Sequence, residues 1–135
     1  MQDKSLEEQQ NNPLHGVGLE QVITELVDHY GWDILDTAMR FNCFHMNPSI
    51  ASSVKYLKKT EWAREKLERF YLSRYKRMPK PTPEEMETPA RQRTFAVGVT
   101  PREPMVLTVD SILDSQAKAA STYKAKKAQN RKPRR

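Results

Sequence analysis

The sequence predicts an all-α protein: a compact four-helix domain over residues 12–78, a Pro-rich linker over residues 79–110, and a basic, weakly ordered tail over residues 111–135, helical in part. Apolar residues recur at three- and four-residue spacing through the first segment, as on one face of a helix. Nine of the eleven aromatic residues lie between Tyr30 and Tyr75, whereas seven of the nine prolines lie from Pro79 onward. The polar residues 1–11 are expected to be disordered.

The first two helices are separated by a glycine. Residues 19–30 carry an apolar stripe from Leu19 to Tyr30, and Gly31 is a natural stop because glycine adopts the left-handed conformation without steric penalty. A shorter second helix is expected to turn Trp32, Leu35, Ala38 and Met39 inward. Residues 41–46 lack helical spacing and are expected to form a partly buried loop.

The third and fourth helices have recognisable starts. Asn47 is expected to cap the third helix, with Pro48 in its first turn, where no backbone N–H is needed. Its core stripe is predicted to be Ile50, Val54 and Leu57. Thr60 is expected to cap the fourth helix, which buries Ala63, Leu67, Phe70 and Tyr71, and the Trp62 ring is expected to cover the junction between the two.

The net charge of +6 is unevenly distributed along the chain. Residues 1–46 sum to −6, residues 47–80 to +7 and residues 81–135 to +5. At about 100° per residue, Lys55, Lys58 and Lys59 share an arc away from the apolar stripe, with Ser52 at its edge. Such a helix face suits phosphate contact. A solvated face with Glu65 paired to Arg69 is the alternative interpretation of these charges.

A series of short motifs follows in a distinctive order: Pro13-Leu14-His15-Gly16, Tyr30-Gly31-Trp32, Asn42-Cys43-Phe44, Pro48-Ser49-Ile50, Ser52-Ser53 and Thr60-Glu61-Trp62-Ala63-Arg64. In these motifs the chain resembles a small bacterial family, typified by a Vibrio protein, over about residues 12–72. The resemblance implies a compact four-helix motif that binds double-stranded DNA, with a fold likened to the C-terminal DNA-binding domain of recombinase A. The chain departs from the family pattern at Ala51, where a lysine is common, and at Glu61, where a proline is common.

These observations predict a non-enzymatic protein of the bacterial cytoplasm and nucleoid that binds double-stranded DNA through phosphates, with low sequence specificity. The candidate contacts on the domain are Ser52, Lys55, Lys58, Lys59, Arg64, Lys66 and Arg69. The candidate contacts on the tail are Lys124, Lys126, Lys127, Arg131 and Lys132, a basic arm that suits RNA as well as DNA.

The alternative function is a protein-interaction adaptor. In that case the acidic first helix, through Glu20, Glu25 and Asp28, docks a basic partner protein, and the tail associates with RNA or ribosomes. Neither function calls for a cofactor. Cys43 and His45 fall short of the ligand spacing of a metal site, no catalytic constellation is present, and no apolar run is long enough to span a membrane.

Overall fold

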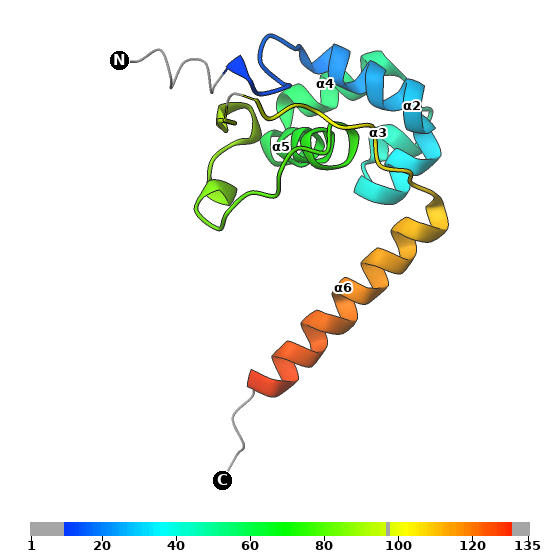
Figure 1. Ribbon diagram of the computed structural model, residues 1–135. Coiled ribbons are helices and arrows are strands. Elements are labelled where there is room, and N and C mark those ends of the chain that lie inside the picture. The colour runs from blue at the N-terminus through cyan, green and yellow to red at the C-terminus, as the bar shows by residue number, and fades with distance from the viewer. Residues whose placement is uncertain (1–9, 97, 131–135) are drawn as a thin grey trace.

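The computed structural model describes residues 10–96 and 98–130 of the 135-residue chain. In this part of the chain the regular secondary structure is entirely helical, which confirms the predicted all-α class. Helices α2 (Leu19–Met39), α3 (Asn42–His45), α4 (Ile50–Lys59) and α5 (Glu61–Phe70) form one compact body, and α6 (Val109–Asn130) projects from it (Figure 1). Of the predicted disordered N-terminus, residues 1–9 lie outside the described residues.

Gly31 divides α2 into two helical segments, as the sequence predicts. Its backbone lies at φ +83° and ψ 164°, a region that glycine occupies readily and other residues occupy only under strain. The first segment buries one face and the second segment buries another. The buried side chains are Val22, Ile23, Leu26 and Tyr30 before the break, and Leu35 and Met39 after it.

The connection into α4 differs from the prediction in two ways. Residues 41–46 are not a loop, because Asn42–His45 form a short helical turn that buries Phe44 beside Phe41. The cap of α4 is Ser49 and not Asn47: the Ser49 hydroxyl accepts a hydrogen bond from the Ser52 N–H at 3.1 Å. Asn47 instead takes a left-handed conformation, with φ +46°, and turns the chain before the helix begins.

Helix α5 continues into a π-helical turn, Tyr71–Tyr75, so that Ala63, Leu67 and Tyr71 are all buried. The expectation that the Trp62 ring is buried over the α4–α5 junction is wrong, since 64% of its surface is exposed. Only Thr60 separates α4 from α5, and this short connection fixes the orientation of the new helix. Trp62 lies about 100° around the helix from Ala63, outside the buried face.

Residues 79–107, called the strap below, contact the domain at separate points, while residues 82–87 are exposed. Ala90 is fully buried in the core, and Phe95, Val99 and Leu107 pack against it in part. Two neighbouring asparagines attach the strap to the start of the domain. The buried Asn12 side chain donates to the Ala90 and Arg93 carbonyls, and Asn11 donates to the Ala96 and Val99 carbonyls. The Pro-rich segment predicted as a linker is therefore in contact with the folded core.

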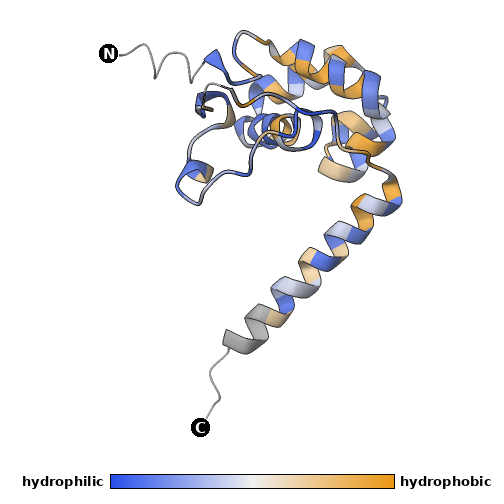
Figure 2. Ribbon diagram, in the orientation of Figure 1, coloured by the Kyte–Doolittle hydropathy of each residue, from blue (hydrophilic) through white to orange (hydrophobic). Residues whose placement is uncertain are grey.

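Helix α6 begins with a reciprocal pair of hydrogen bonds between Thr108 and Ser111, each accepting from the other's backbone N–H. Ile112 is buried, and the Gln116 amide donates to the Thr37 carbonyl of α2 at 3.1 Å. Beyond these contacts the helix extends clear of the domain (Figure 1). Figure 2 shows that its strongly hydrophobic residues lie near its start and that polar residues dominate farther along. Most of the segment predicted as the tail lies within α6.

Candidate nucleic-acid interface

The outward face of α4 carries Lys55, Lys58 and Lys59, all exposed; with Ser52 they are called the α4 basic face below. None of these three ammonium groups forms an ion pair with an acidic group among residues 10–96 and 98–130. Ser52 is also exposed, but its hydroxyl lies 2.9 Å from the Ser49 hydroxyl and takes part in the helix cap. The three lysines are therefore the members of this face with free polar groups.

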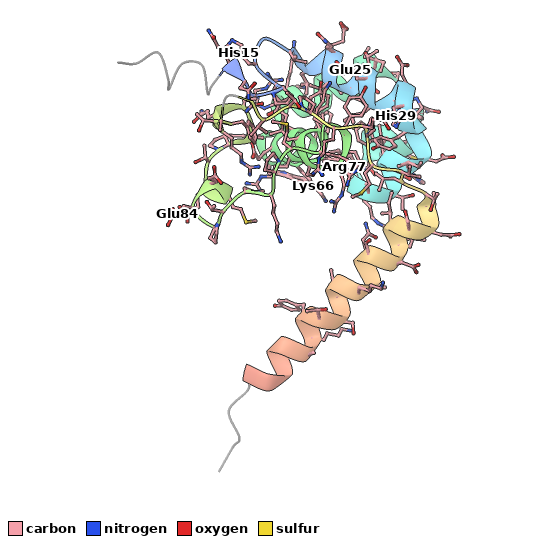
Figure 3. The ribbon with its side chains drawn as sticks, viewed as in Figure 1. His15, Glu25, His29, Lys66, Arg77 and Glu84 are labelled. Carbon is pink, nitrogen blue, oxygen red and sulfur yellow. The ribbon has the colours of Figure 1, made fainter. Side chains whose placement is uncertain are left out.

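The basic residues of α5 differ in what they contact. Lys66 is exposed, with its ammonium 5.9 Å from the centre of the Phe41 ring, and Figure 3 labels it on α5. Arg69 donates to the Glu65 carboxylate at 2.8 Å and to the Met86 carbonyl of the strap at 3.1 Å. Arg64 is half-buried. Among these predicted contacts Lys66 has the most accessible charge, whereas Arg69 holds the strap to α5.

An open groove of about 750 Å³ lies between α5 and the strap. It brings together the predicted residues Lys59, Arg64 and Arg69, and Trp62 lines it as well. Its charges are mixed. The lining also includes the carboxylates of Glu61, Glu65, Glu68 and Glu87 and the guanidinium of Arg91. The sequence did not indicate this groove, because residues of the strap form one of its walls.

Two carboxylates in the groove are engaged in holding the strap. Glu65 accepts a hydrogen bond from the Ala90 N–H at 3.0 Å, in addition to its pair with Arg69. Glu68 is 3% exposed and forms an ion pair with Arg91, which also donates to the Leu14 carbonyl. Burial raises the pKa of the Glu68 carboxyl, and the Arg91 hydrogen bond and charge oppose that rise. Two of the four carboxylates in the groove are thus engaged in holding the strap to the domain.

The predicted tail contacts lie on a different part of the molecule. Lys124 is exposed on α6, in the portion that extends away from the domain (Figure 1). Lys126 and Lys127 fall within the backbone of α6, but their side chains lie outside the described part of the structure, as do Arg131 and Lys132 altogether. The structure therefore does not bring the described tail lysine together with the α4 basic face.

The acidic residues proposed for the adaptor function are not equivalent. Glu20 and Asp28 are exposed on α2. Glu25 accepts a hydrogen bond from the Tyr71 hydroxyl at 3.1 Å and lies 3.9 Å from the Lys76 ammonium, so that it ties α2 to the π-helical turn. Burial, together with the Glu25 charge and hydrogen bond, raises the pKa of Tyr71. Figure 3 labels Glu25 on α2. Glu25 thus has a structural role inside the domain.

The described residues contain neither a cluster of metal-binding side chains nor a helix that could span a membrane. No three or more His, Cys, Asp or Glu side chains of residues 10–96 and 98–130 are placed to hold a metal ion. Cys43 is half-buried, and His45 lies with Nδ1 3.1 Å from the Asp36 carboxylate. Across the same residues, each helix is too short or too polar to cross a bilayer.

One known protein family matches most of this helical domain. Residues 10–72 match the model of the family described as "DNA-binding protein VF530". This segment is similar to that family. The match covers α2 to α5 and ends inside the π-helical turn, and it confirms the family resemblance predicted from the motifs. No curated protein matches the chain.

The strap and α6 lie outside the VF530 segment, although the strap completes its core. The exposure of Trp62 is a further feature of this segment, contrary to the burial predicted from the sequence. A signal for it was present in the spacing, because Trp62, Lys66 and Arg69 are four and seven residues apart and so share one helix face. Two charged residues at these positions indicate a face turned toward solvent.

Proposed function

We propose that this protein binds double-stranded DNA without catalysis, through phosphate contacts made by Lys55, Lys58 and Lys59 of the α4 basic face and by Lys66. The observation that carries the proposal is that these four lysines are exposed and make no ion pair with the described acidic groups. They lie on a domain of a family described as DNA-binding. Unpaired ammonium groups on adjoining helices can neutralise phosphates and release the counterions condensed on DNA.

Low sequence specificity follows from the kinds of side chain on this surface. A lysine ammonium is a compact charge that contacts phosphates from many directions, whereas base recognition uses bidentate Arg, Asn or Gln side chains. Arg69 and Arg91, which have that geometry, are held by Glu65 and Glu68. We therefore assign the domain a phosphate-contacting role and assign α6, with Lys124 and the basic residues that follow it, an auxiliary electrostatic role.

The test is a titration with duplex DNA at several salt concentrations. About three or four phosphate contacts from the domain predict a log–log slope near −3 with residues 108–135 removed. Replacing Lys55, Lys58 and Lys59 together by glutamate should abolish binding by this truncated protein, since three repulsions replace three attractions. The matched control replaces the exposed Arg40, Lys80 and Arg102 by glutamate, which changes the net charge equally at other sites.

Binding that is lost in the α4 variant and retained in the control supports the proposal. Equal loss in both variants would mean that overall charge, and not the α4 basic face, determines binding. Unchanged duplex binding by the α4 variant would contradict the proposal directly. A parallel titration with structured RNA shows whether the same surface prefers that polymer, in which case the DNA assignment is wrong.

A further inference from the structure

Trp62 presents a large aromatic surface to solvent beside the α4 basic face. Its side chain is 64% exposed, whereas Trp32, the other tryptophan, is half-buried against Phe44 at a ring distance of 5.6 Å. Indole rings bury much apolar area when they pack, and contribute strongly to interfaces. An exposed tryptophan on a helix of the folded domain is therefore a candidate contact surface.

The position of Trp62 is fixed by Phe41. The two ring centres are 5.8 Å apart, and the planes are nearly perpendicular, at 80°. In such an arrangement one ring meets the other with its edge, so Phe41 covers at most one face of the indole. Since Trp62 also lies in the first turn of α5, its free face is held in place by rigid structure.

Phe41 also connects Trp62 to the proposed phosphate contacts. The Phe41 ring lies 5.8 Å from the Tyr56 ring of α4 and 5.9 Å from the Lys66 ammonium of α5. Tyr56 lies on α4 about 60° around the helix from Lys59. The surface therefore runs from the α4 basic face over the aromatic cluster to Lys66 and Trp62.

The charges of α5 indicate the side from which a polyanion approaches Trp62. At about 100° per residue, Glu61, Glu65 and Glu68 fall within an arc of about 60° on the side of Trp62 that faces the groove. Lys66 lies about 40° to the other side, above Phe41. On the groove side, Glu65 and Glu68 are paired with Arg69 and Arg91, and acidic and basic groups are equal in number. The Lys66 ammonium makes no ion pair with a described acidic group, so a phosphate is attracted more strongly on the Lys66 side.

We infer that Trp62 stacks on an unpaired base of DNA whose neighbouring phosphates contact Lys66 and the α4 basic face, an inference that rests on the proposed function. A base inside an intact duplex has both faces covered by its neighbours, so an indole ring gains a stacking contact only where a base is unpaired. The domain should therefore prefer DNA with an unpaired base over perfect duplex. Base–aromatic stacking of this kind corresponds to about 5- to 150-fold in affinity.

The test compares a short duplex with the same duplex carrying one unpaired thymine. The full-length protein should bind the second DNA more tightly, and Trp62→Ala should remove that preference while the salt slope stays close to that of the wild type. Trp62→Phe, which keeps an aromatic face, should restore part of it. In a Trp32→Phe background, the fluorescence of Trp62 should be quenched more strongly by the bulged DNA.

Tyr123→Ala is the matched control, because Tyr123 is as exposed as Trp62, at 66%, but lies on α6. It should leave the preference intact. Equal affinities of the wild type for both DNAs, a preference that survives Trp62→Ala, or an equal loss in Tyr123→Ala would each overturn the inference. None of these results touches the proposed function, which is tested separately by charge reversal on the α4 basic face, its charge-matched control and the titration with RNA.

Discussion

Asn12 is the residue whose removal should most clearly show that the strap belongs to the folded domain. Its side chain is 2% exposed and makes three hydrogen bonds: Nδ2 donates to the Ala90 carbonyl at 2.8 Å and to the Arg93 carbonyl at 3.0 Å, and Oδ1 accepts from the Leu14 N–H at 2.8 Å. Replacing Asn12 by alanine leaves these three backbone groups without partners in a site with little water. At about 1 kcal/mol for each lost bond, and more for a group left buried, we expect Asn12→Ala to lower the free energy of unfolding by about 3–4 kcal/mol.

The assay is urea unfolding followed by circular dichroism, with Asn11→Ala as the matched control. Asn11 is the same residue type in the neighbouring position and also donates to the strap, at 2.8 Å to the Ala96 and Val99 carbonyls. The difference is burial: the Asn11 bond to Ala96 is exposed and its bond to Val99 is only part-buried, whereas the Asn12 bonds are buried, so water can replace the Asn11 bonds more readily. We expect a loss below about 1 kcal/mol for Asn11→Ala. A decrease of about 3 kcal/mol in a domain of this size lowers the melting temperature by about 12–24 °C.

Equal losses for the two variants would refute the reasoning, since burial would then not decide the strength of these bonds. A negligible loss for Asn12→Ala would show that the strap contributes little to stability. In that case the domain would end near residue 78, as the sequence predicts, and residues 79–107 would act as a linker. If the strap is part of the folding unit, a chain ending at residue 78 should be less stable than one ending at residue 107.

Three further predictions follow from single features of the fold. Gly31→Ala should lower the free energy of unfolding, measured with urea, by about 1–3 kcal/mol, because Gly31 has a positive φ that alanine adopts only under strain. The control is Gly18→Ala, where φ is −76° and the decrease should be below about 1 kcal/mol. Glu68 has a raised pKa in the folded protein, so the protonated carboxyl favours folding. This contribution to stability is fully present below the ordinary pKa of 4.5 and is lost as the pH rises through the raised pKa. In Glu68→Gln, which cannot ionise, this pH dependence of the urea midpoint should flatten. Removing residues 108–135 should make the salt slope of DNA binding shallower while leaving binding measurable; an unchanged slope would show that α6 makes no phosphate contact.

The local pattern of the sequence predicts much of the helical domain. The spacing of Val22, Ile23, Leu26 and Tyr30 predicts a buried helix face, and the permissive backbone of Gly31 predicts the break that follows it. The exposed faces of α4 and α5 follow from the same periodicity, because a helix that buries one stripe turns the opposite residues to solvent. The phosphate-contacting role of the lysines on those faces remains a prediction.

Cap choice and the neighbours of each side chain depend on the rest of the fold. Asn47 and Ser49 are both good caps, and the left-handed turn at Asn47 leaves that role to Ser49. A tryptophan in the first turn of a helix is compatible with burial or exposure, and the single-residue connection between α4 and α5 turns the Trp62 ring outward over Phe41.

By itself the sequence determined where the longer helices form, though not the short α3, because long helices follow from apolar spacing and caps among residues a few positions apart. Only the tertiary structure decided that residues 79–107 close the core, since the bonds that hold the strap join Asn12 to Ala90 and Glu68 to Arg91, groups far apart in the chain. Proline-rich sequence predicts extended backbone but not what it packs against. Contacts of that kind appear only when the helices have assembled a surface that the strap can cover.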